Sequence, residues 1–301
     1  MTMASILTNE YYRNHPLPFA DNLLENCVVV ISGGGSGIGK AAAWQAARLG
    51  AKVAICARNS DRLLAVSNAI NDAGFHCDHK NLDIRNREQV DDFLGGVFRR
   101  HGKVDILINS AGGQFAQNAA DFSEKGWASV VETNLTGTFN MMQAAARRWL
   151  AEQVKGSIVN VTFSPHGLHQ MAHSVAARCG VMGFSEAVAV EWAPNIKVNC
   201  VAPGTVASDH FTLEEKRLYS QTNPMLDTGA PWDLAAACLF IGGPLSPFIT
   251  GQTLHINGGA NLWGESWPLG KPAKLCSATA VWGDEGESAK DRYVAEKRFQ
   301  R

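Results

Sequence analysis

The sequence predicts an α/β fold in which a parallel β-sheet is covered by helices on both faces. Apolar runs of strand length recur along the chain, and segments with the helical spacing of apolar residues separate them. The runs are rich in Val and Ile and do not alternate with polar residues, which is typical of strands buried on both faces. We therefore expect a single, doubly wound domain with a seven-stranded parallel sheet.

Seven apolar segments carry the expected strands, and longer segments between them carry the expected helices. The strands are residues 27–32, 52–57, 75–84, 104–113, 156–162, 196–204 and 251–258. The helical patterns cover residues 40–50, 60–74, 87–102, 123–150 and 172–192. We expect residues 1–22 to form an N-terminal arm, residues 23–260 the domain, and residues 261–301, where the periodicity is lost, a C-terminal extension.

The composition excludes several classes of protein. Hydrophobic residues make up 46% of the 301 residues, and the formal net charge of −1 gives no sign of a nucleic-acid partner. The seven cysteines are scattered without a CxxC pair, which indicates free thiols in a reducing compartment. No run reaches the ~18 apolar residues of a membrane span, and the first residues do not resemble a signal peptide. We expect a cytoplasmic location.

The stretch "ISGGGSGIGK" follows the first expected strand and opens the first helix. Its glycines, Gly33, Gly37 and Gly39, leave backbone N–H groups at the helix N-terminus open to a pyrophosphate. The strict G-x-G-x-x-G spacing is absent, and glycine-rich turns also occur for backbone reasons alone. The strand before the turn and the helix after it favour a dinucleotide site of the Rossmann type.

The end of the second expected strand indicates which dinucleotide binds. An acid at this position would accept a hydrogen bond from the adenosine ribose 2′-hydroxyl, but the segment reads "ICARN", with Arg58 at the tip and no acid before Asp61. An arginine suits a 2′-phosphate because its forked donors make a charged, two-pronged contact. The alternative is an ordinary solvated arginine. We expect NADP(H).

Together these features resemble the short-chain dehydrogenase/reductase family from about residue 27 to residue 259. The motifs that carry the resemblance are Gly33-x-x-x-Gly37-x-Gly39, "NLDI" with Asp83, "NSAG", "ETNLTGTF" with Asn134, and "APGTVAS". The resemblance implies that Asn134 is catalytic. It also implies a cofactor site made of Ser32, Gly33, Ser36, Gly37, Ile38, Arg58, Asp83, Asn109, Ala111, Gly112, Arg178, Pro203, Gly204, Val206 and Ser208.

Within this family, the segments "GGQF", "SEKGW" and "AHSVAARCGV" are most similar to the peroxisomal trans-2-enoyl-CoA reductases. Bacterial citronellol-type dehydrogenases and the 2,4-dienoyl-CoA reductases are also similar. The resemblance implies a homotetrameric, NADPH-linked oxidoreductase that acts on an acyl-CoA thioester or a hydrophobic, terpenoid-like alcohol.

The expected catalytic helix departs from the family pattern. Ser174 and Arg178 replace the family's Tyr-x-x-x-Lys, and Phe163 replaces its serine, with Thr162 and Ser164 on either side. Serine is a far weaker acid than tyrosine, and arginine keeps its charge but releases no proton. Reduction of a C=C bond conjugated to a thioester needs hydrogen-bond donors at the thioester oxygen and no immediate proton transfer. We therefore expect Ser174 to donate to that oxygen and Arg178 to hold the cofactor.

Histidines offer two alternatives to this interpretation. His173 adjoins Ser174 and could act as the acid. Two groups have the spacing of metal ligands, His166 with His169 and His173, and His76 with His79. We interpret His76 and His79 as surface residues and expect no metal site.

Three functional hypotheses remain: an enoyl thioester reductase, an alcohol or aldehyde dehydrogenase, and a catalytically silent NADP(H)-binding scaffold. A cavity filled by Phe163 would favour the scaffold, whereas an open pocket with donors would favour an enzyme. For a tetramer, we expect contacts through residues 123–150 and 172–192, since both have apolar residues beyond one core stripe.

Overall fold

The computed structural model describes residues 8–164, 168–207 and 212–262. Its centre is a seven-stranded parallel sheet with the strand order β3-β2-β1-β4-β5-β6-β7, so the predicted fold class is confirmed. The strands are β1 (Val28–Ser32), β2 (Lys52–Ala57), β3 (His76–Asn81), β4 (Ile106–Asn109), β5 (Gly156–Val161), β6 (Ile196–Pro203) and β7 (Thr253–Ile256).

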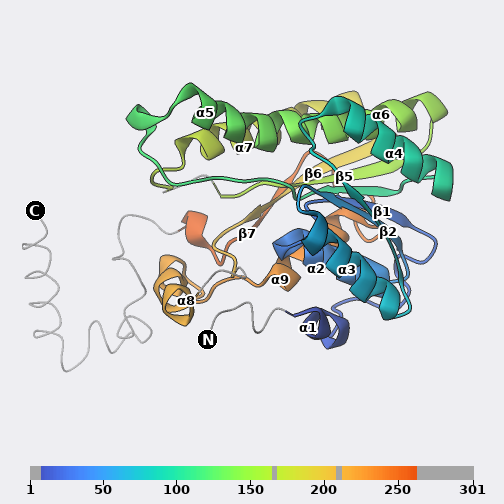
Figure 1. Cartoon of the computed structure of the whole chain (residues 1–301), viewed down its shortest axis with the longest axis horizontal. Helices are drawn as coiled ribbons and strands as arrows, with labels where there is room; N and C mark the ends of the chain where they lie inside the picture. The colour runs from blue at the N-terminus through green and yellow to red at the C-terminus, as the bar shows by residue number, and fades with distance from the viewer. Residues whose placement is uncertain (1–7, 165–167, 208–211, 263–301) are drawn as a thin grey trace, which may run out of the picture.

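Helices form one layer on each face of the sheet (Figure 1). The first layer contains α4 (Arg87–His101), α5 (Glu124–Val131), α6 (Gly137–Glu152) and α7 (Ala172–Glu191). The second contains α2 (Gly37–Arg48), α3 (Ser60–Asp72) and α9 (Pro231–Gly242), with α1 (Asn9–Asn14) packed outside α2. The other helical elements of the described chain are short. They are α8 (Leu213–Tyr219), a π-helical turn (Glu132–Thr136) and 3₁₀ turns at Ala119–Asp121, Ser220–Thr222 and Ala260–Leu262.

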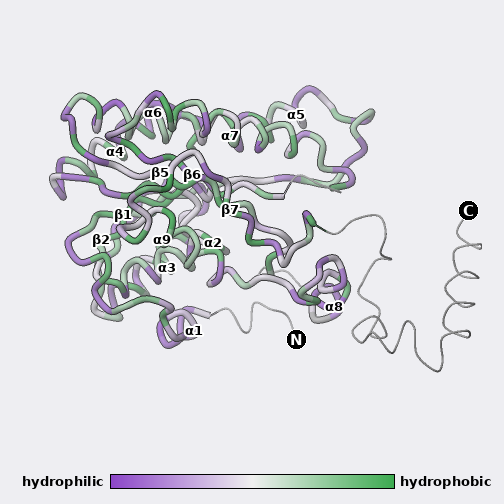
Figure 2. The backbone as a smooth tube through the Cα atoms, turned by 180° about the vertical axis from the view of Figure 1, so that it is seen from behind, coloured by the Kyte–Doolittle hydropathy of each residue, from purple (hydrophilic) through white to green (hydrophobic). Residues whose placement is uncertain are grey.

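The strands send alternate side chains into two separate cores, as the two-residue period of a strand requires. Val29 and Ile31 of β1 pack with α2, α3 and α9. Val28 and Val30 pack with α4, α6 and α7 on the other face. The hydrophobic segments in Figure 2 lie mainly along the strands between the helical layers. Burial on both faces explains why an inner strand such as β1 reads as a continuous apolar run, whereas the edge strand β3 is polar and largely exposed.

Helix α9, which packs against α2 and the sheet, was not predicted from the sequence. Its sequence, "PWDLAAACLFIG", is apolar on nearly every side, so it shows no amphipathic period that would distinguish it. Pro231 at its first turn favours a helix start, because proline lacks a backbone N–H and none is needed for the helix at this position.

The described part of the N-terminal arm packs against the domain. Tyr12 of α1 is buried, and its ring stacks on Trp232 of α9. Arg48 of α2 donates to the carbonyl oxygens of Tyr12 and His15. Among the described residues the cysteines are free thiols, and no helix has the length and apolarity to cross a membrane.

The connectivity places a crevice at the carboxyl ends of the strands. From β1 the chain proceeds outward to β2 and β3, and it then returns to β4 on the other side of β1. The loops that leave β1 and β4 therefore turn to opposite faces and open a crevice between them, which is where ligands bind in open α/β sheets.

Candidate active site

A cavity of about 1040 Å³ occupies this crevice. Most of the predicted cofactor residues line it, from the β1, β2 and β4 ends to the segment after β6. Those that line it are Gly33, Ser36, Gly37, Ile38, Arg58, Asp83, Ala111, Gly112, Arg178, Pro203, Gly204 and Val206. Ser32 and Asn109 lie behind the wall in a buried hydrogen-bond network, and Ser208 falls outside the described residues.

The glycine turn leaves the N-terminus of α2 open toward the cavity. Ser36 is the residue before the helix, and its side chain makes no capping hydrogen bond. Gly37 has a φ of +50°, which disfavours larger residues, and a Cβ added there would meet no atom within 4 Å. The unsatisfied N–H groups of a helix start, with no side chain covering them, fit the pyrophosphate of a dinucleotide.

Two arginines line the cavity beyond the end of β2. Arg58 follows β2 directly, and Arg62 lies in the first turn of α3. Asn59 between them also lines the cavity, and its side chain caps α3 by accepting from the Arg62 N–H. Asp61 is not among the residues that line the cavity. Positively charged side chains therefore lie where an acid that binds the ribose would be expected. Arg62 was not predicted from the sequence as a site residue.

Asp83 lines the cavity just beyond β3, and its carboxylate is already engaged. Arg85 Nε lies 3.0 Å from Oδ1 and 2.9 Å from Oδ2 of Asp83. Hydrogen bonding to Arg85 lowers the pKa of Asp83, so this carboxylate is ionised at neutral pH.

Asn134 lies in the π-helical turn between α5 and α6, and it fixes the loop after β4. Its Oδ1 accepts from the Gly113 N–H at 2.9 Å, and its Nδ2 donates to the Gly113 carbonyl at 2.8 Å. The side chain is buried and does not line the cavity. In this structure Asn134 therefore holds the Gly113 backbone at the cavity wall.

Ser174, in the first turn of α7, is fully buried and does not line the cavity. Its hydroxyl donates to Gln114 Oε1 at 2.8 Å. Gln114 itself lines the cavity, and its Nε2 has no hydrogen-bond partner among the described residues. The Ser174 hydroxyl thus orients the Gln114 amide and leaves its N–H groups unpaired on a residue that lines the cavity. Gln114 was not predicted from the sequence as a site residue, although it stands in "GGQF" in the loop that follows β4.

His173 is also fully buried, in an aromatic cluster beside the loop after β4. Its ring stacks on Phe122 at 4.4 Å and meets the edge of Phe115 at 4.6 Å. Its Nδ1 accepts from the Ser174 N–H at 2.9 Å. The structure does not bring His173 to the cavity, and its described contacts are those of a packing residue.

Arg178 reaches the cavity from the next turn of α7. Its Nη1 donates to the carbonyl oxygens of Val161 and Thr162 at 2.9 and 3.3 Å, whereas its buried Nε has no partner among the described residues. Burial lowers the pKa of Arg178 to about 10, so the guanidinium is still charged at neutral pH. A Cβ at Gly112 would lie 2.6 Å from Arg178 Nη2, so glycine is needed for this approach.

Phe163 forms part of the wall and does not fill the cavity. It is half-buried, and the Arg178 guanidinium lies 5.7 Å from its ring centre. On either side of it, the Thr162 hydroxyl donates to the Val201 carbonyl, and Ser164 Oγ accepts from Asn257 Nδ2. Tyr219, at the end of α8, also lines the cavity and was not predicted. Because Phe163 does not fill the cavity, the geometry favours the open pocket expected of an enzyme over the filled cavity expected of a silent scaffold.

Comparison with known proteins identifies the family. Residues 27–218 match the sequence profile of the short chain dehydrogenases. The chain belongs to this family. Its members bind a nicotinamide cofactor, NAD or NADP, and the open α2 N-terminus described above fits such a dinucleotide.

Relatives of this short-chain dehydrogenase include proteins of different activities. It is 31% identical to a probable 2,4-dienoyl-CoA reductase of Bacillus subtilis, over 82% of this chain and all of that protein. It is 34% identical to the 3-oxoacyl-[acyl-carrier-protein] reductase of Vibrio cholerae, over 78% of this chain and 98% of that protein. The structure of a citronellol catabolism dehydrogenase from Pseudomonas aeruginosa matches with a TM-score of 0.73 at 31% identity, over 81% of this chain and 98% of that one.

Proposed function

We propose that this short-chain dehydrogenase is an NADP(H)-dependent reductase of the C=C bond of an enoyl-CoA thioester. The observation that carries the proposal is the hydrogen bond from Ser174 to Gln114, which leaves an amide donor facing the cavity in the region where the family places tyrosine. Enoyl reduction needs a donor to the thioester oxygen, and an amide N–H meets that need without being an acid.

Each residue of the site has a separate role in the proposed reaction. A nicotinamide, when bound, would supply the hydride that the β-carbon needs. Gln114 Nε2 donates to the thioester oxygen as negative charge builds there, and Ser174 holds Gln114 Oε1 so that the amide cannot turn away. The charged Arg178 would hold the nicotinamide ribose and add positive potential beside the reacting atoms. Asn134 fixes the Gly113 backbone next to Gln114. Water supplies the later proton to the α-carbon.

The preference for NADP(H) rests on Arg58 and Arg62. Both line the cavity beyond β2, and no carboxylate from that segment does so. Two guanidinium groups favour a 2′-phosphate through charged hydrogen bonds and offer a 2′-hydroxyl no acceptor.

A second candidate is carbonyl reduction or alcohol oxidation, as the names of the Vibrio and Pseudomonas relatives suggest for those proteins. The observation that favours it is Tyr219, a phenol that lines the cavity. Phenols can act as acids in such reactions, but Tyr219 comes from α8 and not from the α7 position at which the family has its tyrosine.

We also propose a homotetramer in a reducing, cytoplasmic compartment. Trp127, Leu150 and Val190, on α5, α6 and α7, are exposed apolar side chains on the helical layer where contacts are expected. The residues after 262 lie outside the described chain, and we propose that this extension covers a neighbouring subunit's pocket.

A substrate panel tests the proposed activity. Purified protein is assayed with NADPH and crotonyl-, decenoyl- or dienoyl-CoA, with NADPH and a 3-oxoacyl thioester, and with NADP⁺ and citronellol or geraniol. Rapid NADPH consumption with an enoyl thioester alone supports the proposal. Turnover of the 3-oxoacyl thioester or the alcohols, with no enoyl reduction, would reject it in favour of the second candidate.

A further inference from the structure

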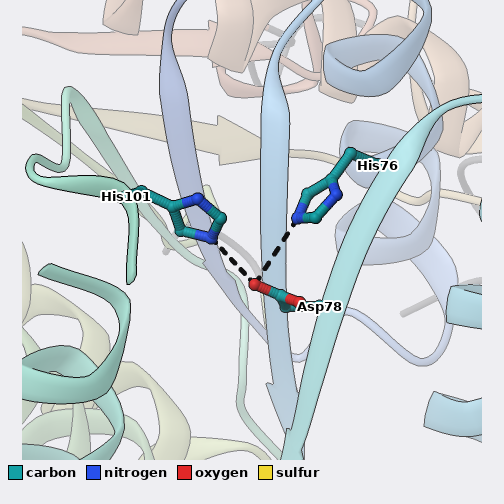
Figure 3. Close-up of side chains that lie close together, drawn as sticks. All are labelled: His76, Asp78 and His101. Carbon is teal, nitrogen blue, oxygen red and sulfur yellow. Dashed lines mark hydrogen bonds and ion pairs between the residues drawn. The ribbon is translucent and has the colours of Figure 1, made fainter. Parts of the chain in front are cut away.

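Two histidines and an aspartate converge, and both imidazole rings contact the carboxylate (Figure 3). They lie at the outer edge of the sheet, where β3 ends the strand order. His76 and Asp78 belong to β3, and His101 is the last residue of α4. His101 Nε2 lies 2.8 Å from Asp78 Oδ2, and His76 Nε2 lies 3.6 Å from the same oxygen. One potential ligand atom from each residue lies within 4.8 Å of the other two.

The backbone fixes this juxtaposition. His76 and Asp78 are two residues apart on an edge strand, so their side chains leave the same face of the sheet. His79 leaves the other face, where its ring contacts Ser67 Oγ at 3.1 Å. Gly102 ends α4 in the left-handed region with a φ of +76°, which holds His101 at the helix terminus.

We propose that His76, Asp78 and His101 form a zinc site. Two imidazoles and one carboxylate are ligands that Zn²⁺ accepts, and three protein ligands leave a fourth position for water. Bonds of about 2.0–2.1 Å in a tetrahedral site place ligand atoms about 3.3–3.4 Å apart, and the separations of 2.8 and 3.6 Å from Asp78 Oδ2 lie on either side of that value. Small side-chain rotations suffice to admit the ion.

The exposure of the three side chains suits a site that fills from solvent. The His101 side chain is 5% exposed, Asp78 22% and His76 48%. The two imidazole rings are nearly perpendicular, at 83°, with centres 5.3 Å apart. His101 and Asp78 are therefore already held in place by packing. The more exposed His76 side chain can rotate to bind the ion from the solvent side.

Arg100 competes with a metal ion for this position. Its Nη1 lies 2.6 Å from Asp78 Oδ2, and its side chain is 59% exposed. When Zn²⁺ binds Oδ2, the guanidinium must give up this oxygen, because the ion and the Nη1 donor would occupy the same position. Its exposure permits that movement, and a neutral residue at position 100 should strengthen zinc binding.

The proposed zinc site is independent of the catalytic cavity. His76 begins β3, whereas Leu82 and Asp83, beyond the other end of this strand, line the cavity. Four residues of extended chain, or about 13 Å, separate Asp78 from Leu82 at the cavity wall. Zinc bound here would join the end of α4 to β3 and stabilise the folded chain, without supplying a catalytic group.

Isothermal titration of the untagged full-length protein with ZnCl₂ tests the proposal. We expect one ion per chain at micromolar affinity, reversed by a chelator, together with a higher melting temperature. His76→Ala and Asp78→Asn should each weaken binding by more than about tenfold, since even groups behind the ligands commonly change affinity about 10–100-fold. Arg100→Gln should tighten it. His79→Ala, from the opposite face of the same strand, is the matched control and should bind like the wild type.

Binding of Co²⁺ gives a second readout, because a tetrahedral site with these ligands produces a visible absorption band. Loss of that band in His76→Ala, with an unchanged circular dichroism spectrum, would distinguish loss of a ligand from loss of folding. The proposal is overturned if the wild type takes up no zinc at micromolar concentration. It is equally overturned if His76→Ala and Asp78→Asn bind zinc as tightly as the wild type does.

Discussion

Ser174 and Gln114 share one hydrogen bond, and its direction determines which side chain can act on a substrate. The Ser174 hydroxyl donates to Gln114 Oε1, so the donor left for a substrate on the cavity wall is the Gln114 amide. Gln114→Ala should therefore lower enoyl reduction by about 10²–10³-fold, the usual cost of one lost oxyanion donor. Ser174→Ala should lower it by at least about tenfold, because the amide is then free to rotate. Steady-state assays with saturating NADPH measure both.

Two further variants complete this test. Gln117→Ala, on the same loop and outside the cavity wall, should keep its activity. If His173→Ala abolished turnover while Gln114→Ala and Ser174→Ala kept it, the proton would come from His173 and the assignment would be wrong.

Arg58 is expected to set the preference between the two dinucleotides. A charged, forked contact to the 2′-phosphate contributes about 1.5–3 kcal/mol, or roughly 10–150-fold in affinity. Arg58→Ala should therefore weaken NADPH binding and leave NADH binding nearly unchanged, so NADH is the internal control in a fluorescence titration. Equal affinity of the wild type for both cofactors would contradict the assignment.

Arg178 carries a buried positive charge that lowers the stability of the folded chain. Burial lowers its pKa below that of the unfolded chain, to about 10, so at neutral pH the buried charge opposes folding. Arg178→Met should weaken NADPH binding while the melting temperature stays the same or rises. Calorimetry beside a cofactor titration measures both effects, and a large loss of stability would show that the guanidinium is mainly a structural group.

At the scale of elements, the loop after β4, the π-helical turn and α7 meet at Gly112. A Cβ at Gly112 would lie 2.6 Å from Arg178 Nη2 and 2.7 Å from Asn134 Oδ1, whereas a Cβ at Gly113 would meet nothing within 4 Å. Gly112→Ala should lower both the melting temperature and the affinity for NADPH. Gly113→Ala is the matched control for stability, and equal melting temperatures for the two variants would refute this account of the junction.

The same elements show what could be predicted from sequence. Val- and Ile-rich strands and the glycine turn marked the sheet and the cofactor end of the cavity, because strand and turn patterns are local. The hydrogen bond between Gln114 and Ser174 was not predictable, because it joins the loop after β4 to the first turn of α7, 60 residues further along the chain. The sequence separation of His76 and His101 likewise gives no indication that the edge strand β3 meets the end of α4. Helix α9 was missed because its uniform apolarity hides its period.

At the scale of the whole molecule, the exposed apolar residues of α5, α6 and α7 are expected to be covered by other copies of the chain. Light scattering at micromolar concentration should therefore give the mass of a tetramer, and a monomer would reject the assembly. Deletion of residues 265–301 should reduce turnover if the extension covers a neighbouring pocket. Unchanged assembly and turnover after that deletion would remove the role proposed for the extension.

The central claim is that this cavity delivers hydride to the β-carbon of an enoyl thioester without a catalytic tyrosine on α7. The most direct test incubates the wild type with crotonyl-CoA and NADPH that carries deuterium at the transferred position, followed by mass spectrometry and NMR of the product. The account predicts butyryl-CoA with one deuterium on its β-carbon, formed much more slowly by Gln114→Ala. The absence of saturated product, together with deuterium on the carbinol carbon of a 3-hydroxyacyl thioester made from a 3-oxoacyl substrate, would contradict it.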